Sequence, residues 1–361
     1  MAVLRARVDA AHEPFIYREL DDLEGYVPFL LCEHVIMSHG LKLRVHCQRM
    51  RRVLLHGNHF PMVPPSEYPS LQSLLKMAHT KAMLAEFLRD AIPYLLFAKK
   101  SGIPLISFYR GFELSDPRVC AMLPTLSAVC CKVIARSIFQ KKELVRAGFP
   151  ARKIVVEYGG IDLAQLPFQP RAFERGSLRI LAAGRFVEKK GFDLVLDVAE
   201  KVKSWRTGAR VTVIGDGALA DWIKAQVIER KLQDIVTIKL FMPQRAFYAE
   251  LGQHDIFLFP CRTAENKDRE GIPNVLKEAM ASGLSVVSTF HAGIPELIED
   301  GASGYLVPEN DVQALYKRIE ALCSYPARTR KMALRARQTV EERFSIEKSQ
   351  AGLLKVLNNC L

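Results

Sequence analysis

The chain has 361 residues, of which 49% are hydrophobic and 25% charged, and its formal net charge is +12. This length fits two domains of ordinary size better than a single core. No apolar run approaches the roughly 18 residues of a membrane span, and the N-terminal stretch MAVLRARVDAAHEPF lacks the apolar block of a secretory signal. The basic charge fits an anionic membrane or a phosphorylated ligand. Nucleic acid is disfavoured, because neither aromatic platforms nor zinc-finger spacing accompany the charge.

The eight cysteines form no CxxC pair, and Cys130 and Cys131 are adjacent in the sequence. This pattern predicts neither a zinc site nor a disulfide framework. We therefore expect a protein of the reducing cytoplasm.

The first half of the chain alternates strands and helices, although less legibly than the second. The stretch 60–70 holds four prolines and is predicted to be a loop, and the domain boundary is expected within 162–177, where Pro, Gly and charge replace periodicity. The candidate strands are MAVLRAR, RRVLLHG, PLISFY, AVCCKVIA and KIVVEY, and DAIPYLLFAKKSG and SIFQKKELVRAGF are the candidate helices.

The second half shows repeated strand–helix units. The predicted strands include SLRILAAG, ARVTVIGDG, IVTIKLF, DIFLFPC and SVVST, with amphipathic helices such as GFDLVLDVAEKVKSW between them. Repeated units of this kind imply a parallel sheet with helices on both faces. We predict an α/β protein of two Rossmann-like, doubly wound domains, residues 1–168 and 169–345, that face each other across a cleft. Ligands of such folds bind at the carboxyl ends of the strands.

A candidate phosphate site follows the first strand of the second half. In LAAGRFVEKKGFD the strand ends at Gly184, and Arg185 and Lys190 precede the next helix. Two cations beside a helix N-terminus suit a diphosphate, and the alternative is a solvated loop. Gly215 and Gly217 in VIGDG either let a backbone approach a ligand closely or form a plain turn. They do not complete a dinucleotide fingerprint, which disfavours a nicotinamide-dependent oxidoreductase.

The stretch EGIPNVLKEAMASG carries two carboxylates around a helix start. Pro273 suits the first helical position and Asn274 the first turn, so the helix end offers N–H groups to an anion. Glu270 precedes the helix and Glu278 lies inside it. Carboxylates beside an anion site are useful when they accept hydrogen bonds from neutral sugar or ribose hydroxyls. Taken singly, each glutamate could instead be a solvated surface acid.

Together these motifs resemble the retaining glycosyltransferases of family 4, which have the GT-B fold. The resemblance is carried by GRFVEKKG, the E-x7-E spacing of EGIPNVLKE, AMASGLSVVST, HAGIPELIEDGASGYLVPEND and ERFS. The combination EGIP…HAGIPELIEDG is similar to the branch that builds bacterial exopolysaccharide, colanic-acid and lipopolysaccharide chains. The stretch HEPFIYRELDDL resembles the opening segment of that branch.

The resemblance implies a role for each matched residue. Arg185 and Lys190 would bind the donor's pyrophosphate, Glu270 the transferred sugar and Glu278 the ribose. The backbone that closes over sugar and phosphate would be that of Gly271, Ile272, Pro273, Asn274, Val275 and Leu276. The implied reaction moves a sugar from a UDP- or GDP-sugar to a glycan or lipid-linked acceptor with retention of configuration. A last helix, about 346–361, would pack back on the N-terminal domain.

The N-terminal domain departs from the family pattern. Arg110 takes the place of a usual histidine, and Glu86 takes that of a second one. An arginine still donates hydrogen bonds but is no base at neutral pH, so Arg110 is either a contact of the donor or a structural residue. His12 and Glu13 follow the first strand and could reach the cleft.

Neither a metal nor another cofactor is expected, because the chain contains no Asp-x-Asp pair. The basic stretches SIFQKKELVRAG and SLLKMAHTKAMLAEFL suggest contact with an anionic membrane, which would place the protein at the inner face of the cytoplasmic membrane. The competing hypothesis is a nucleotide-sugar-binding scaffold of the same fold without turnover.

Overall fold

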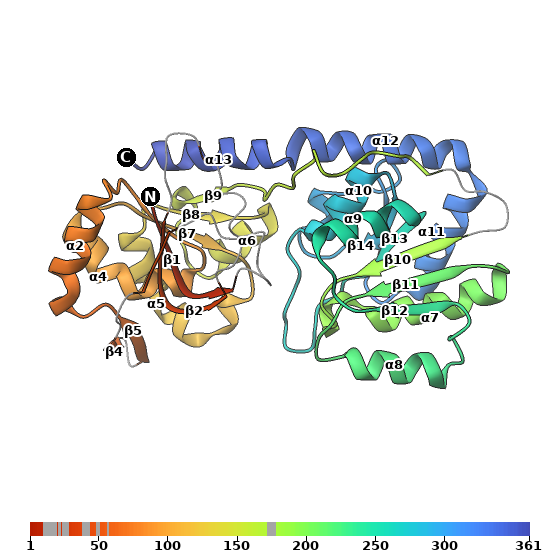
Figure 1. Cartoon of the computed structure of the whole chain (residues 1–361), viewed down its shortest axis with the longest axis horizontal. Coiled ribbons are helices and arrows are strands. Elements are labelled where there is room, and N and C mark those ends of the chain that lie inside the picture. Colours follow the sequence, from red (N-terminus) through yellow and green to blue (C-terminus); the bar gives the residue numbers. More distant parts are fainter. Residues whose placement is uncertain are drawn as a thin grey trace. The chain divides into compact units, whose positions relative to one another are not determined.

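Two parallel sheets organise the chain into two units (Figure 1). The structure is a computed structural model that describes residues 1–9, 20, 23, 29–37, 44–47, 51–55, 58–171 and 178–361. One unit comprises Met1–Gly160 together with Ile346–Leu361, and the other comprises Ile161–Ser345. The unit boundary thus falls just before the predicted linker, and the last helix belongs to the first unit. In the described residues, no helix is long and apolar enough to cross a membrane.

The first unit has a parallel sheet in the order β3-β2-β1-β6-β7-β8-β9. Its strands are β1 Ala2–Asp9, β2 Phe29–Met37, β3 Arg44–Cys47, β6 Met83–Ala85, β7 Leu105–Tyr109, β8 Lys132–Ala135 and β9 Ile154–Val156. Its helices are α2 Tyr68–Met77, α3 Leu88–Ala91, α4 Leu95–Ser101, α5 Pro117–Val129, α6 Ile138–Arg146 and α13 Ile346–Asn358.

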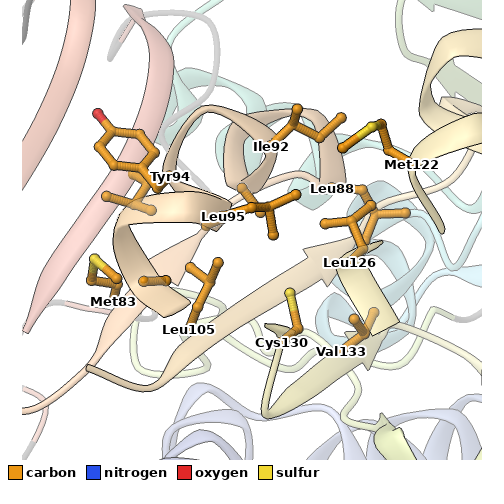
Figure 2. Packing of buried hydrophobic residues seen from close by; sticks show 14 of the residues in the cluster. Met83, Leu88, Ile92, Tyr94, Leu95, Leu105, Met122, Leu126, Cys130 and Val133 are labelled. Carbon is orange, nitrogen blue, oxygen red and sulfur yellow. The ribbon is translucent and has the colours of Figure 1, made fainter. Parts of the chain in front are cut away.

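Strands β6, β7 and β8 are buried on both faces of this sheet, where alternate residues point to opposite sides. Leu105 and Val133 face the core formed with α3, α4 and α5, where Leu88 and Leu126 pack (Figure 2). On the other face, Ile106 and Ile134 of the same strands pack with Leu353, Val356 and Leu357 of α13. The terminal helix is therefore part of the hydrophobic core of the first unit.

The local predictions for the first half have mixed outcomes. RRVLLHG forms β4 (Arg51–Leu55), but this strand pairs antiparallel with β5 (Asn58–Met62) and lies outside the main sheet. The prolines of 60–70 do not make a loop, because α2 begins at Tyr68 and Pro69 lies in its first turn, where a missing N–H costs no hydrogen bond. In AVCCKVIA, α5 continues to Val129 and only the second half is strand.

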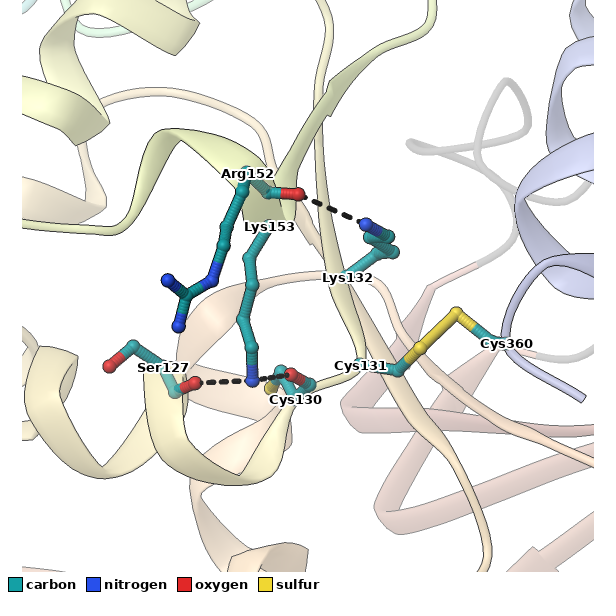
Figure 3. The surroundings of a disulfide bond; sticks show 7 residues. All are labelled: Ser127, Cys130, Cys131, Lys132, Arg152, Lys153 and Cys360. Carbon is teal, nitrogen blue, oxygen red and sulfur yellow. Dashed lines mark hydrogen bonds between the residues drawn. A yellow bond between two sulfur atoms is a disulfide. The ribbon is translucent and has the colours of Figure 1, made fainter.

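The expectation of no disulfide is also wrong, because Cys131 and Cys360 form one (Figure 3). Cys130 packs into the core under α5, whereas Cys131 lies against the opposite core, beside Cys360 at the end of α13. Adjacent residues of an extended backbone point to opposite sides, so the neighbouring thiols have different environments. The bond joins positions 229 residues apart in sequence and fastens α13 to the start of β8.

We expect Cys360→Ser to lower the free energy of unfolding of the first unit by about 2–4 kcal/mol, because the disulfide restricts the unfolded chain. Chemical denaturation should show that reduction of the wild type lowers its free energy of unfolding by the same amount as Cys360→Ser. Cys323→Ser, which changes a free cysteine of the second unit, is the control. If all eight cysteines of the purified native protein react with a thiol reagent after mild unfolding without reductant, the bond is absent and the prediction is wrong.

The second unit has a parallel sheet in the order β12-β11-β10-β13-β14-β15. Its strands are β10 Arg179–Ala183, β11 Arg210–Ile214, β12 Val236–Lys239, β13 Ile256–Phe259, β14 Ser285–Thr289 and β15 Tyr305–Val307. Its helices are α7 Phe192–Trp205, α8 Ala220–Glu229, α9 Gln244–Gln253, α10 Asn274–Ser282, α11 Val312–Ser324 and α12 Pro326–Arg343. The predicted strand–helix units of this half are confirmed. The strand order reverses between β10 and β13, which marks the switch point where doubly wound sheets bind ligands.

Candidate functional site

Two predicted site residues meet at the switch point of the second sheet. Lys190 ends a short 3-10 helix (Glu188–Lys190) that follows β10, and Glu270 lies in the segment that follows β13. Although far apart in sequence, their side chains form an ion pair, and both are largely shielded from solvent. The Lys190 ammonium also lies 4.8 Å from the centre of the Phe259 ring. The neighbouring strand ends thus bring a cation and a carboxylate together.

Glu270 is held in its ionised form by two lysines. Burial alone would raise the pKa of this carboxyl, but Lys190 and Lys189 outweigh that effect and lower the pKa to about 2. Lys189 lies 4.0 Å from Glu270, and its ammonium contacts Asp268 at 3.0 Å and donates to the Arg269 carbonyl at 3.3 Å. Lys189 therefore ties the 3-10 helix to the loop that carries Glu270.

A buried histidine supports the backbone of the same loop. The Glu270 N–H donates to Nε2 of His291 at 2.9 Å, and Nδ1 of His291 lies 2.6 Å from a carboxylate oxygen of Glu309. The Thr263 N–H donates to the other Glu309 oxygen at 2.8 Å. His291 is completely buried, and burial lowers its pKa although Glu309 opposes that effect. The ring is therefore neutral at pH 7.

Helix α10 begins beside this carboxylate. Pro273 is its N-cap and Asn274 its first residue, so the helix begins one residue later than predicted. No side chain among the described residues caps this end, so its first N–H groups are free of side-chain acceptors. Glu278 is buried within the helix, where Tyr248 and Gln244 of α9 each donate to it at 3.3 Å.

The other residues expected around the donor fall into two groups. Near the start of α10, four of these residues are partly exposed, namely Gly271, Ile272, Asn274 and Val275. Pro273 and Leu276 are buried, so only their backbone groups could contact a ligand. Arg185 is exposed directly after β10, and its guanidinium has no ion-pair or hydrogen-bond partner in the part of the chain that the structure describes.

Gly215 and Gly217 have a packing role. A Cβ on Gly215 would lie 2.0 Å from the carbonyl oxygen of Gly184, and one on Gly217 would lie 2.8 Å from that of Phe186. The close approach at VIGDG is thus between protein backbones, whereas approach to a ligand stays a prediction.

In the first unit, four charged residues follow four adjacent strands. Glu86 follows β6, Arg110 follows β7, Arg136 follows β8 and Glu157 follows β9. They form two ion pairs, Arg110 with Glu86 and Arg136 with Glu157. Both guanidinium carbons lie near the Phe108 ring, at 4.7 and 4.3 Å from its centre. The two residues that replace histidines of the family pattern are therefore partners of each other.

Glu113, three residues after Arg110, is also buried beside this row. Burial raises the pKa of its carboxyl to about 8, although the backbone N–H groups of Arg110 and Arg89 donate to it. The remaining predictions for this unit have mixed outcomes. His12 and Glu13 lie outside the described residues. The stretch 73–88 is not one amphipathic helix, because α2 ends at Met77 and β6 is a buried strand.

Sequence reasoning missed Lys189, His291 and Glu309. Lys189 is adjacent to Lys190, and nothing in the dipeptide tells which lysine supports the loop and which contacts Glu270. His291 begins the motif HAGIPELIEDG and Glu309 lies in PEND, so both stood in stretches that already carried the resemblance. The signal that could have found His291 and Glu309 is a polar residue two positions after the end of each of two neighbouring strands.

Known proteins resemble this chain in sequence and in fold. Residues 167–339 match the family model described as glycosyl transferases group 1. This segment, which lies within the second unit, is similar to a group 1 glycosyltransferase domain.

Two curated relatives share this part of the chain. Identity is 35% over 218 residues with the putative colanic acid biosynthesis glycosyltransferase WcaL of Escherichia coli (strain K12), covering 59% of this chain and 54% of that protein. It is 38% over 215 residues with the amylovoran biosynthesis glycosyltransferase AmsK of Erwinia amylovora, covering 60% and 53%. The chain spans about half the length of the curated relatives it matches.

Solved structures extend the likeness to the whole fold. The complex of Anabaena Alr3699/HepE with UDP has a TM-score of 0.79 at 16% identity, with coverage of 99% of this chain and 100% of that one. A glycosyltransferase from Rickettsia africae ESF-5 has a TM-score of 0.81 at 18% identity, with coverage of 99% and 97%. The predicted GT-B fold of two Rossmann-like α/β domains is thereby confirmed.

Proposed function

We propose that this protein is a retaining glycosyltransferase that moves a sugar from a nucleotide-diphosphate sugar to a glycan or lipid-linked acceptor in bacterial surface polysaccharide assembly. The observation that carries the proposal is the contact of Lys190 with Glu270 at the switch point, directly before α10. A cation, a carboxylate and a helix N-terminus meet there, which suits a ligand that is anionic at one end and rich in hydroxyls at the other. The names of WcaL and AmsK support the polysaccharide class.

In this proposal the charges divide the work of the transfer. As the glycosidic bond breaks, negative charge grows on the leaving phosphate and positive charge on the sugar ring. Lys190, the exposed Arg185 and the α10 amides stabilise the phosphate, so they act more strongly on the transition state than on the ground state. Glu270 accepts hydrogen bonds from the sugar, and Glu278 accepts them from the ribose. Arg110 of the first unit is retained as a candidate contact of the donor.

We further propose that the reaction needs no metal or other cofactor, since basic groups take the place that a divalent cation has in other glycosyltransferases. The proposed site of action is the inner face of the cytoplasmic membrane. This proposal rests on the basic surface and not on the cysteines, because the Cys131–Cys360 disulfide is unusual for a reducing compartment. The exposed Ile138 and Val145 of α6, interleaved with Lys141, Lys142 and Arg146, support contact with an anionic lipid surface.

A thermal-shift panel of UDP, GDP, ADP and their glucose or mannose conjugates tests the proposal. A ligand at about a hundred times its dissociation constant stabilises the fold by roughly 2.7 kcal/mol. We expect a shift with one base, unchanged by magnesium or EDTA. The shift should be lost in Glu278→Ala and kept in Glu229→Ala, which alters an exposed helix. If no nucleotide shifts the melting temperature, the protein has lost its donor site, and a scaffold that no longer binds nucleotide-sugar becomes the better hypothesis. If a nucleotide-sugar binds but no sugar is transferred, the nucleotide-sugar-binding scaffold without turnover is the better hypothesis.

A further inference from the structure

A row of hydrogen bonds through the buried ring of His291 adjoins the loop that carries the carboxylate of the candidate donor site. We propose that His291 is a positioning residue, which fixes the backbone of Glu270 so that the carboxylate meets the sugar of the donor rather than its nucleotide. The inference rests on the role proposed above for Glu270.

The hydrogen bonds tie the loop after β13 at two points. Glu309 follows β15 and accepts from the Thr263 N–H, near the start of that loop. His291 follows β14, lies next to Glu309 and accepts from the Glu270 N–H, near the end of the same loop. The ends of two neighbouring strands thus fix both ends of the loop, and His291 is the residue in direct contact with Glu270.

This arrangement admits one form of the imidazole. Because a backbone N–H can only donate, Nε2 of His291 must carry a lone pair, and the proton must sit on Nδ1, where the Glu309 carboxylate accepts it. Protonation of Nε2 would set two N–H groups against each other. His291 is completely buried, so no solvent can substitute for either partner.

The lysines and the histidine control different parts of Glu270. Lys190 and Lys189 attract its carboxylate, whereas His291 holds its main chain. Without His291 the ion pair would persist, but the carboxylate would be carried by a less constrained backbone. A displacement of about 1 Å in a reacting site costs on the order of a hundredfold in rate. His291 therefore acts on sugar recognition and leaves the nucleotide contacts of Glu278 intact.

The chain offers a matched control in His254. This histidine is also buried in the second unit, and both of its ring nitrogens are engaged, with the Glu250 carbonyl at 2.7 Å and the Thr212 hydroxyl at 2.9 Å. Neither partner belongs to the candidate site. His254→Phe and His291→Phe therefore remove similar buried interactions, and only the second touches Glu270.

The first test needs no ligand. Long-range ¹H–¹⁵N NMR spectra of the wild type should show His291 as the Nδ1–H tautomer. Hydrogen exchange followed by mass spectrometry should show faster exchange of the peptide containing Glu270 in His291→Phe, and no change there in His254→Phe. An Nε2–H tautomer, or an exchange rate at Glu270 that His291→Phe leaves unchanged, overturns the proposal.

The second test compares the affinities of UDP and UDP-glucose by calorimetry. In His291→Phe we expect the ratio of the two affinities to change by about tenfold or more, with UDP itself changed by less than about twofold. His291→Gln, whose amide oxygen can accept the Glu270 N–H, should recover part of the ratio. Equal losses for UDP and UDP-glucose would show a merely structural role. If the wild type binds neither, the donor proposed above is wrong for uridine, while the tautomer and the exchange rates still decide the role of His291.

Discussion

Replacing Lys190 with methionine is expected to lower turnover by about a hundred- to thousandfold. Methionine keeps much of the aliphatic packing on Phe259 but removes the ammonium that the proposal aims at the leaving phosphate. Loss of one preorganised charge-stabilising donor has an effect of this size in other enzymes. Single-turnover rates with the donor chosen by the nucleotide panel measure it, and an unchanged rate would exclude Lys190 from the mechanism.

The same variant has a distinct effect on stability, because Glu270 loses its nearest cation. In the wild type the pKa of Glu270 is lowered from 4.5 to about 2, so its ion pairs stabilise the fold above pH 4.5, and this contribution is lost as the pH falls toward 2. In Lys190→Met burial raises this pKa again. The stability gap between the two proteins should therefore be largest at neutral pH and narrow on acidification.

Denaturation curves at a series of pH values check this second effect. Lys203→Met is the control, since Lys203 pairs with Asp234 at 2.7 Å on an exposed surface, where ion pairs contribute about 0–1 kcal/mol. A stability gap that is independent of pH would show that Lys190 does not set the ionisation of Glu270.

The strands of the second unit could be predicted from sequence because they are short apolar runs separated by amphipathic helices. Arg185 comes two residues after β10, and Lys190 and Glu270 lie in the loops that follow β10 and β13, so their place at the edge of the sheet could be predicted. Which of them touch could not. The ion pair links Lys190 to Glu270 and leaves Arg185 exposed, an outcome set by the geometry of strands β10 and β13 rather than by spacing.

The strands and the disulfide of the first unit were harder to predict from the sequence, for physical reasons. Strand β6 has three residues, Met83–Ala85, which are buried on both faces and show no alternation. Residues this apolar fit a helix as well as a strand. The disulfide was hidden because its partners are 229 residues apart in sequence, and only the return of α13 to the first sheet brings them together.

The sequence alone left open whether Arg110 contacts the donor or has a structural role. The contact of Arg110 with Glu86 supports a structural role. Glu86 is completely buried and the Arg110 side chain is 12% exposed, and the guanidinium donates to both the carboxylate and the carbonyl of Glu86. Removing one member of a buried ion pair costs about 3–5 kcal/mol, because the other charge stays in a medium of low polarity. Arg110→Met should therefore destabilise the first unit by an amount of this order.

The matched control is Arg118→Met. Arg118 forms an ion pair with Asp116 at 2.7 Å in the same unit, but its side chain is 59% exposed, so we expect little change in stability. If Arg110→Met unfolds at the same denaturant concentration as this control, the buried pair does not form in solution.

Arg110→Met alone cannot separate folding from catalysis, and the double variant Glu86→Gln, Arg110→Gln can. It removes both charges together, so neither residue is left as an uncompensated buried charge, and we expect the double variant to be more stable than Arg110→Met. Its turnover per folded molecule then reports on the guanidinium itself. A large loss would place Arg110 among the groups that act on the donor. Unchanged turnover would mean that the ion pair is a structural substitute for the two histidines, and that catalysis depends on Lys190, Glu270 and the helix end of the second unit.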